Sequence, residues 1–303
     1  MEKKVIVITG PTASGKSDYA IEVAKFLDTE IISADSRQVY KYLDIGTAKP
    51  DKNQLQSLKH HLIDFLEPDE EFNASIFEIQ ATAIIKKLHK EGKIPVVAGG
   101  TGLYIKSLVD GMFDGPSKNL EFRAQMHGIL ERDGIVKLLE LLREKDPESA
   151  SKMNPGNWKR IIRALEVFEL TGMPIWAHHQ QQEKNSDISF YLFALDMPRE
   201  ILYDRIEKRV DLMIASGLEI ETKKVLEMGY STTLNSLNTV GYKEMINYIC
   251  NEISHDRCVE LIKRNSRRYA KRQVTWWRAD SRIKWLQAAA LPSPAELVDL
   301  IHQ

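Results

Sequence analysis

Apolar runs and helical patterns alternate at the start of the chain. The runs VIVIT, EIISAD and IPVVAGG end at Thr9, Asp35 and Gly100, and amphipathic helical patterns cover Asp18–Leu27 and about Ile76–Glu91 between them. Strands that alternate with helices in this way pair in parallel, because each helix crosses back over the sheet before the next strand begins. The pattern therefore predicts an α/β fold built on a parallel sheet with flanking helices.

Between residues 114 and 187 the apolar positions recur at helical spacing. GILERDGIVKLLELLREKD and NWKRIIRALEVFELTG each place apolar residues on one helix face, and the second pattern stops at Gly172 and Pro174. The polar run HHQQQEKNSD, residues 178–187, predicts a linker or long turn. This stretch is therefore predicted to be all helical up to that linker.

A strand pattern returns after the helical stretch. FYLFALD, residues 190–196, has the apolar run of another buried strand, and the pattern from about Arg199 onward is again helical. The predicted organisation is a core domain of residues 1–113 and 188–303, with an all-helical domain of residues 114–187 inserted into it.

Composition narrows the class of protein. With 303 residues, of which 43% are hydrophobic and 28% charged, the chain is long enough for one large or two modest globular domains. It has no apolar run of about 18 residues and no cleavable signal pattern, so we expect a cytoplasmic protein without a membrane segment. Cys250 and Cys258 lack the spacing of a disulfide framework or a zinc finger. A monomer is the expected state.

GPTASGKS has the spacing of a phosphate loop and lies between a predicted strand and a predicted helix, which indicates a phosphate-loop NTPase-like sheet. The glycines let the backbone turn so that successive amide N–H groups point at one anion. Lys16 adds a positive charge, and Ser17 can ligate Mg²⁺. The predicted diphosphate-binding residues are Gly10, Pro11, Thr12, Ala13, Ser14, Gly15, Lys16 and Ser17. The loop does not reveal what the diphosphate carries.

Asp35 follows the second predicted strand, at the carboxyl end where open parallel sheets bind ligands. Two roles remain open for it: a Mg²⁺ ligand, as in other phosphate-loop enzymes, or a general base near the transferred group. Ser36, Arg37 and Gln38 add hydrogen-bonding groups beside it. The amide of Gln38 suits the donor and acceptor pair of an adenine edge.

Two further patterns place polar groups near this edge of the sheet. GGTGLY follows the third strand, so Thr101 can present its hydroxyl to the same crevice, although the motif also fits a turn without a ligand role. Arg205 and Arg209 lie one helical turn apart on one face and can clamp a leaving diphosphate, although exposed helices carry such charges routinely.

The net charge of −1 hides an uneven distribution, because residues 257–284 hold ten Lys or Arg and two acidic residues. In RRYAKRQVTWWR the cations alternate with aromatic side chains, which is typical either of a core-facing aromatic stripe with a solvated basic face or of nucleic-acid binding. NWKRIIRALEV forms a second basic helix face. The two sets of cations are Arg268, Lys271 and Arg272, and Lys159, Arg160 and Arg163. Two separate basic helices favour a large folded RNA as the partner.

These segments, taken in order, resemble the tRNA dimethylallyltransferases of bacterial type, also called tRNA isopentenyltransferases. The matching segments are GPTASGKS, ISADSRQVYKYLDIGTAKP, HHLID, VVAGGTGLYIKSL, RIIRALEVFELTG, LYDRIEKRVDLM, VGYKE and RRYAKRQVTWWR. They span nearly the whole chain, and the second segment is far more specific than the phosphate loop alone.

The resemblance implies a substrate and a reaction. The loop would hold dimethylallyl diphosphate, and the dimethylallyl group would pass to the exocyclic amino group of the adenine 3′ of the anticodon, forming isopentenyladenosine and releasing diphosphate. Asp35 would remove the amino proton, Thr101 would join it in catalysis, and Lys16, Arg209 and Mg²⁺ at Ser17 would stabilise the leaving group. The implied contacts of the tRNA anticodon stem-loop are Asp35, Ser36, Arg37, Gln38, Thr101, Arg123, Lys159, Arg160, Ile161, Ile162 and Arg163.

A small-molecule or nucleotide kinase that uses ATP is the alternative function. GPTASGKS, and FALDMPRE followed by arginines, also occur in that class. A small phosphoryl acceptor does not need the basic aromatic segment near the carboxyl end, however, and this difference favours the RNA substrate.

Overall fold

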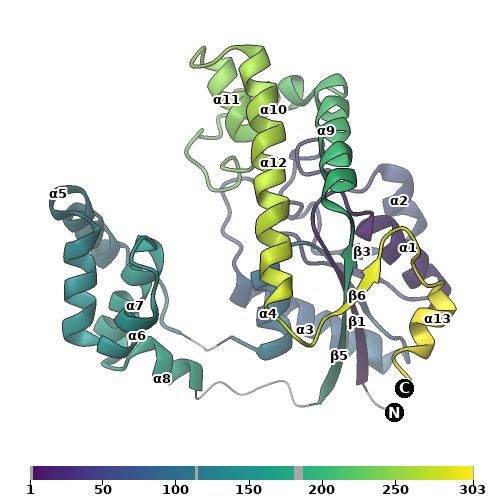
Figure 1. Cartoon of the computed structure of the whole chain (residues 1–303), viewed down its shortest axis with the longest axis horizontal. Coiled ribbons are helices and arrows are strands. Elements are labelled where there is room, and N and C mark those ends of the chain that lie inside the picture. The colour runs from purple at the N-terminus through teal and green to yellow at the C-terminus, as the bar shows by residue number, and fades with distance from the viewer. Residues whose placement is uncertain (1–2, 113–114, 181–186, 303) are drawn as a thin grey trace. The chain divides into compact units, whose positions relative to one another are not determined.

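The structure is a computed structural model that describes residues 3–112, 115–180 and 187–302 (Figure 1). It divides into two compact units, one formed by Met1–Val109 with Ser186–Gln303 and the other by Asp110–Asn185. The sequence pattern places the ends of the inserted part at 114 and 187, a few residues later at each end. Over the described ranges, no helix combines the length and the apolar character that crossing a bilayer requires.

A sheet of six parallel strands forms the centre of the first unit. The strands are β1 (Lys3–Thr9), β2 (Ile31–Ser33), β3 (His60–His61), β4 (Val96–Ala98), β5 (Ile188–Asp196) and β6 (Lys284–Gln287). Their spatial order is β3-β2-β4-β1-β5-β6, so β1 lies between β4 and β5, with Val7 opposite Val97 and Leu192. The predicted parallel α/β sheet is confirmed.

Helices cover both faces of this sheet. They are α1 (Lys16–Phe26), α2 (Lys52–Ser57), α3 (Ala74–Lys90), α4 (Gly102–Asp110), α9 (Arg199–Ala215), α10 (Leu218–Glu227), α11 (Tyr242–Ile249), α12 (His255–Arg278) and α13 (Pro294–Asp299). Ile6 and Ile8 of β1 pack in one core with α1 and α13, whereas Val5 and Val7 belong to the core on the other face, with α3, α4 and α12. VIVIT is apolar throughout because successive side chains of a strand point to opposite faces, and both faces are covered.

The prediction of helices alone after Arg199 is wrong at β6. This strand pairs in parallel with β5, with Phe193 opposite Lys284 and Leu195 opposite Leu286. Its sequence KWLQ lacks a continuous apolar run, because an edge strand needs less apolar surface than a central one. The other edge strand, β3, contains two His residues and gives no strand signal either.

The second unit is helical in its described part. Its helices are α5 (Leu120–Lys145), α6 (Pro147–Lys152), α7 (Trp158–Thr171) and α8 (Ile175–Gln180), and they enclose a core of their own around Leu138, Leu142 and Leu165. Gly134 has non-helical dihedral angles and kinks α5. Gly172 ends α7 in the left-handed conformation, with a φ of 68°, as its position in the pattern predicts.

The predicted linker of residues 178–187 needs a correction at its beginning. Helix α8 continues to Gln180, so the polar run starts inside a helix. Residues 181–186, which make up most of the remaining run, lie outside the described residues.

Candidate active site

The phosphate loop joins β1 to α1 and has the backbone that its glycines predict. The φ angle is 146° at Gly10, 65° at Ala13 and 90° at Gly15, all in the region that favours glycine. A Cβ on Gly10 would also lie 3.3 Å from backbone atoms of Leu195 in β5. Both the conformation and the close approach of the next strand therefore require a glycine at the start of the loop.

Three cationic side chains surround the loop. Lys16 Nζ donates to a loop carbonyl oxygen at 3.3 Å, and Arg209 Nη1 donates to Thr12 Oγ1 at 3.1 Å. Nη2 of Arg205 lies 3.8 Å from the position that a Cβ on Gly15 would take. Helix α9 thus brings both predicted arginines to the loop.

Burial alters the ionisation of this cluster. It lowers the pKa of Lys16 to about 8; the Asp35 carboxylate opposes that shift, and Arg209 adds to it. Burial also lowers the pKa of Arg209, again against the attraction of Asp35. Cations gathered away from water favour a bound polyanion, because the anion replaces the lost solvation. The cluster therefore has the charge that a diphosphate needs.

Asp35 has one fixed carboxylate oxygen and one open one. Oδ1 accepts the backbone N–H of Arg37 at 2.8 Å and that of Gln38 at 3.4 Å. Within the described part of the chain, Oδ2 accepts no hydrogen bond, and it is not a buried atom. The electrostatic influence of Asp35 reaches both Lys16 and Arg209. A carboxylate oxygen is thus available beside the cationic loop, to a proton or to a metal ion.

Thr101 holds the segment that carries Asp35. Its Oγ1 accepts the backbone N–H of Ser36 at 2.9 Å and donates to Ser36 Oγ at 3.3 Å. These two bonds use the donor and one of the two acceptor sites of the hydroxyl. The bonds to Ser36 place Thr101 beside the segment of Asp35, at the sheet edge where the sequence predicts it. Its part in catalysis stays a prediction.

Gln273 of α12 links the loops that follow two neighbouring strands, β1 and β4. Its Oε1 accepts the N–H of Thr12 in the phosphate loop at 2.8 Å, and its Nε2 donates to the carbonyl oxygen of Gly100 at 2.9 Å. The side chain is buried, and a Cβ on Gly100 would lie 2.3 Å from Nε2. The sequence pattern places Gln273 in the aromatic stripe without giving it this role.

Gln38 presents an acceptor alone, which corrects the predicted donor and acceptor pair. Its Nε2 donates to the carbonyl oxygens of Thr47 at 3.2 Å and Ala48 at 3.0 Å, so both amide hydrogens are used. No described residue donates to its Oε1, which is accessible, and Gln38 lines the cavity. The amide therefore favours a ligand that brings an N–H group.

Glu221 and Tyr242 hold the loop that orients Gln38. The carboxylate of Glu221 accepts the backbone N–H groups of residues 44–46 at 3.0 to 3.3 Å and the Tyr242 hydroxyl. Tyr242 has no exposed surface, and its ring would lie 2.4 Å from a Cβ on Gly46. VGYKE contains this tyrosine, but nothing in that segment alone points to a distant loop.

These groups enclose a cavity of 320 Å³. Polar and charged side chains, among them Lys16, Asp35 and Arg209, form part of its lining. The rest includes apolar side chains of α9, α12 and the segment before α11, which are Ile206, Val210, Met213, Val240 and Ile262. The cavity therefore joins an anion-binding surface to an apolar one.

The cations predicted on α12 are available to a ligand. Arg268, Lys271 and Arg272 are exposed, and none forms an ion pair with a described acidic residue. Arg272 also lines the cavity. The tryptophans of the aromatic stripe differ in exposure, since Trp277 is 3% exposed and Trp276 is 38% exposed.

The arginines predicted in the helical unit are bound to a buried carboxylate. Arg123 donates from Nε and Nη2 to Glu166, and Arg163 donates from Nη1, each at 2.7 Å. Burial would raise the pKa of Glu166, which has no exposed surface, but these hydrogen bonds outweigh it and bring the pKa to about 2. Both arginines thus contribute to the fold of this unit.

The remaining predicted contacts in α7 differ from one another. Ile161 and Ile162 are buried in the core of the helical unit, so their side chains are not available to RNA. Lys159 and Arg160 are exposed, and Lys159 lies over the ring of Trp158 at 5.3 Å.

Comparison with known proteins places this site in a family. The chain matches the model of the IPP transferase family over residues 38–280. It is 46% identical over 290 residues to a tRNA dimethylallyltransferase of Caldanaerobacter subterraneus subsp. tengcongensis, which covers 94% of this chain and 92% of the relative. The crystal structure of the full-length tRNA isopentenylpyrophosphate transferase from Bacillus halodurans superposes with a TM-score of 0.73 at 35% identity, covering 99% of this chain and 96% of that one.

A eukaryotic dimethylallyltransferase, solved in crystallographic snapshots of its action on tRNA, is also similar. It superposes with a TM-score of 0.78 at 29% identity, covering 95% of this chain and 74% of that one. These neighbours confirm the phosphate-loop NTPase-like fold, and the matches extend over both units. The chain therefore belongs to the tRNA dimethylallyltransferase family, the IPP transferases.

Proposed function

We propose that the chain transfers a dimethylallyl group from dimethylallyl diphosphate to the exocyclic amino group of the adenine 3′-adjacent to the anticodon of tRNA. The products are isopentenyladenosine and diphosphate. The observation that carries this proposal is the 320 Å³ cavity, which combines the cations Lys16 and Arg209 with apolar side chains and an open carboxylate oxygen of Asp35. A short prenyl diphosphate needs both kinds of surface, and its acceptor needs a base.

The cationic loop serves the leaving group. The bond between C1 of the dimethylallyl group and the diphosphate oxygen breaks, both electrons leave with the oxygen, and negative charge grows on the diphosphate. Lys16, Arg209 and the loop amides are already in place around that charge, so they stabilise the transition state without rearranging. Arg209 is held by its hydrogen bond to Thr12.

Asp35 acts as the base that takes a proton from the nucleophile. The exocyclic nitrogen N6 forms the new bond to C1 and must lose one of its two protons, because the alkylated nitrogen would otherwise carry a positive charge. Oδ2 of Asp35 is open to accept that proton, while the amides of Arg37 and Gln38 fix Oδ1. General bases of this kind contribute about 10² to 10⁴ in rate.

Gln38 favours adenine over guanine. Adenine presents an amino group at position 6, where guanine presents a carbonyl oxygen. The free Oε1 of Gln38 can accept the second N–H of the amino group but would repel a carbonyl oxygen, because the amide hydrogens are bonded to Thr47 and Ala48. This polarity supports adenine as the target.

We propose Mg²⁺ as the cofactor, with the hydroxyl of Ser17 as the protein oxygen that fits it. Ser17 is exposed at the start of α1 and lines the same cavity as Lys16. Over the ranges that the structure describes, no three His, Cys, Asp or Glu side chains form a metal site, so diphosphate oxygens would complete the coordination, as is usual for Mg²⁺. When bound, the ion would neutralise charge on the diphosphate.

The tRNA would meet α12 near this cavity. Arg268, Lys271 and Arg272 are the cations available to the phosphates of the anticodon stem-loop. The target base lies stacked in its loop, so it has to be flipped out to reach Asp35. A tRNA substrate accords with the cytoplasmic location expected from the sequence.

Nucleoside analysis tests the proposal. The protein is incubated with Mg²⁺, labelled dimethylallyl diphosphate and an unmodified anticodon stem-loop RNA, and the RNA is then digested. We expect labelled isopentenyladenosine from RNA with adenine at the target position and no label with guanine there. Transfer to the guanine RNA at a similar rate, or phosphorylation of an acceptor from ATP without RNA, would contradict the proposal.

A further inference from the structure

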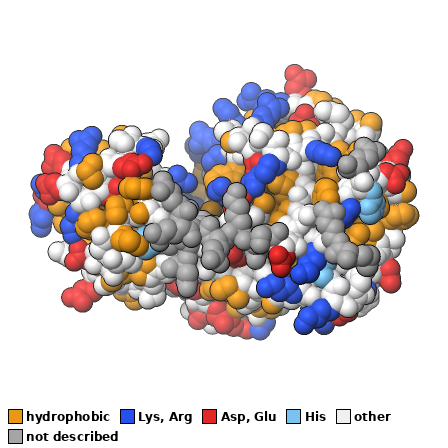
Figure 2. All heavy atoms as spheres, turned by 90° about the horizontal axis from the view of Figure 1, so that it is seen from below, with side chains coloured by type: hydrophobic (Ala, Val, Ile, Leu, Met, Phe, Trp, Pro, Cys, Tyr) orange, Lys and Arg blue, Asp and Glu red, His pale blue; other side chains and the backbone are white. Residues whose placement is uncertain are grey.

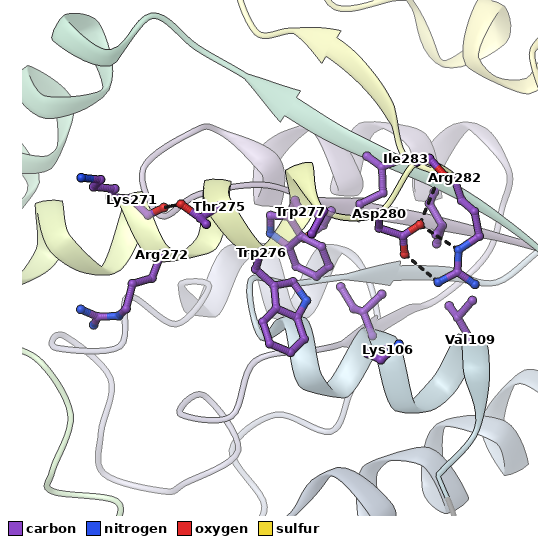
Figure 3. Close-up of a pocket in the computed structure, with 15 residues that line it drawn as sticks. Lys106, Val109, Lys271, Arg272, Thr275, Trp276, Trp277, Asp280, Arg282 and Ile283 are labelled. Atoms are coloured by element: carbon purple, nitrogen blue, oxygen red, sulfur yellow. Dashed lines mark hydrogen bonds and ion pairs between the residues drawn. The ribbon is translucent and has the colours of Figure 1, made fainter. Parts of the chain in front are cut away.

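A second cavity lies along the last turns of α12 and has no part in the chemistry proposed above. Figure 3 shows the residues that line it. Its volume is 790 Å³, compared with 320 Å³ for the reaction cavity. Lys106 and Val109 of α4 line one side, and Trp276 and Trp277 of α12 line another. The segment that leads to β6 adds Ile283. This lining is largely apolar and aromatic.

The two indole groups make the cavity suitable for a flat ring. Trp276 is 38% exposed although it is large and apolar, and its indole packs on the backbone of Gly102, where a Cβ would lie 2.3 Å from Nε1. The missing side chain at Gly102 thus allows the indole to pack directly on the backbone. Trp277 is 3% exposed, so Trp276 is the accessible ring of the pair.

Positive charge accompanies the aromatic lining. Lys271 and Arg272 line the cavity, and neither is paired with a described acidic residue. The acidic side chain in the lining, Asp280, is bound to Arg282, with N–O distances of 2.6 and 2.8 Å. The cavity therefore suits a ligand that is flat and has a negative charge outside the ring.

Arg272 connects this cavity with the reaction cavity. Its side chain lines both, and it lies near Tyr269, with the guanidinium carbon 5.8 Å from the ring centroid. Two adjacent nucleotides of one strand have the same arrangement: two bases with a phosphate between them. An arginine at the junction is placed for that phosphate.

We propose that this cavity binds a second unstacked base of the same RNA, that of a nucleotide adjacent to the target adenine, with Trp276 as its stacking platform. The inference rests on the proposed function, because it presumes an RNA in the reaction cavity. Proteins that recognise single-stranded RNA commonly stack unpaired bases on aromatic side chains. Stacking explains the exposed Trp276, and the adjoining phosphate explains the cations Lys271 and Arg272.

The test measures RNA affinity without chemistry, by fluorescence anisotropy of a labelled anticodon stem-loop in the absence of dimethylallyl diphosphate. It compares the native protein, Trp276→Ala, Trp276→Phe and the control Phe26→Ala, which removes an exposed aromatic side chain from α1 on the other face of the sheet. Each protein is titrated with the intact RNA and with RNAs that lack one base, either 5′ or 3′ of the target adenine.

We expect Trp276→Ala to weaken binding of the intact RNA by about tenfold to a hundredfold, while Trp276→Phe and Phe26→Ala stay within about threefold of the native protein. One of the two RNAs that lack a neighbouring base should bind the native protein and Trp276→Ala with equal affinity. That RNA lacks the base that would stack on Trp276. Equal losses for Trp276→Ala on all three RNAs, or no loss on the intact RNA, would overturn the inference. This assay measures RNA binding and not transfer. If the proposed chemistry were wrong, the failure would appear in the nucleoside analysis and not in the binding data.

Discussion

The cavity of the α/β unit and the Glu166 cluster of the helical unit use cations in opposite ways. In the α/β unit, Lys16 and Arg209 line a cavity with Asp35, and no ion pair joins either cation to a described carboxylate. In the helical unit, Arg123 and Arg163 are bound to the buried Glu166 through charge-assisted hydrogen bonds. Charge that the protein leaves unpaired in a cavity is available to a ligand, whereas charge paired with a buried carboxylate stabilises the fold.

Three cations of α12 differ in the same way from those on the surface of the helical unit. On the face of the helical unit seen in Figure 2, basic side chains are interspersed with acidic ones. On α12, by contrast, Arg268, Lys271 and Arg272 have no acidic partner among the described residues. We therefore expect substitutions in the cavity and on α12 to change activity or binding, and substitutions at the Glu166 cluster to change stability.

The largest effect should come from Asp35→Asn. It removes the proposed base without changing the size of the side chain, so transfer should fall by about two to four orders of magnitude while RNA affinity changes little. Single-turnover assays and anisotropy measure the two quantities. Asp204→Asn is the control, since Asp204 is exposed on α9 and pairs with Lys208. A loss below about tenfold would remove Asp35 from the role of base.

Glu166→Gln should instead lower the stability of the fold. It leaves two arginines beside a neutral buried group, and breaking such a cluster costs about 3–5 kcal/mol of unfolding free energy. Chemical denaturation of the full chain measures this loss, with Glu169→Gln as the control, because Glu169 is exposed on the same helix and pairs with Lys145.

The acid sensitivity of the native protein gives a second test of Glu166. Its folded pKa of about 2 lies below the ordinary value of 4.5, so its contribution to stability is complete above pH 4.5 and is lost as the pH falls toward 2. Glu166→Gln should lack this part of the acid transition. An unchanged unfolding free energy and an unchanged acid transition would show that the cluster does not stabilise the unit.

The affinity for dimethylallyl diphosphate should depend on the charge of Lys16. Since the pKa of Lys16 is about 8 in the empty cavity, the dissociation constant should be flat below pH 8 and rise above it, by up to about tenfold per pH unit. Calorimetry without RNA measures it. Lys16→Arg keeps the charge at high pH and should flatten the profile, whereas a flat profile in the native protein would show that the Lys16 charge does not act on the diphosphate.

The smallest effects should separate the two groups of predicted RNA contacts. Lys271→Ala and Arg272→Ala should each lower the slope of log affinity against log salt by about one unit, because each frees one phosphate. Arg163→Ala should lower the melting temperature more than it changes the slope. Equal slopes for all four proteins, the native one included, would erase the distinction between free and paired cations.

Much of the α/β unit could be predicted because its signals are local. The phosphate loop, the strand ends that carry Asp35 and Thr101, and the helix that carries Arg209 are each contained in one short segment. The parallel topology then gathers the strand ends at one edge of the sheet. The roles of Gln273 and Glu221 could not be predicted, because each depends on contacts with a loop more than a hundred residues away.

The helical unit shows where a pattern of charges is insufficient. Arg163 lies on a basic helix face in the sequence, but its partner Glu166 is on the same helix and buried, and burial cannot be inferred from the charges alone. Ile161 and Ile162 lie in a segment that matches the family, yet they pack into the core. A resemblance identifies the segment, and the structure separates side chains that face a ligand from those that hold the helix.

The release of diphosphate tests the central claim most directly. The native protein, Mg²⁺ and dimethylallyl diphosphate are mixed with stem-loop RNAs that differ only in the target base, and free diphosphate is measured over time. The account predicts one diphosphate released per RNA with adenine at that position, and none with guanine or without RNA, because the leaving group departs only when an amino nitrogen attacks beside Asp35. Equal release with adenine and guanine RNA, or steady release without RNA, would contradict it.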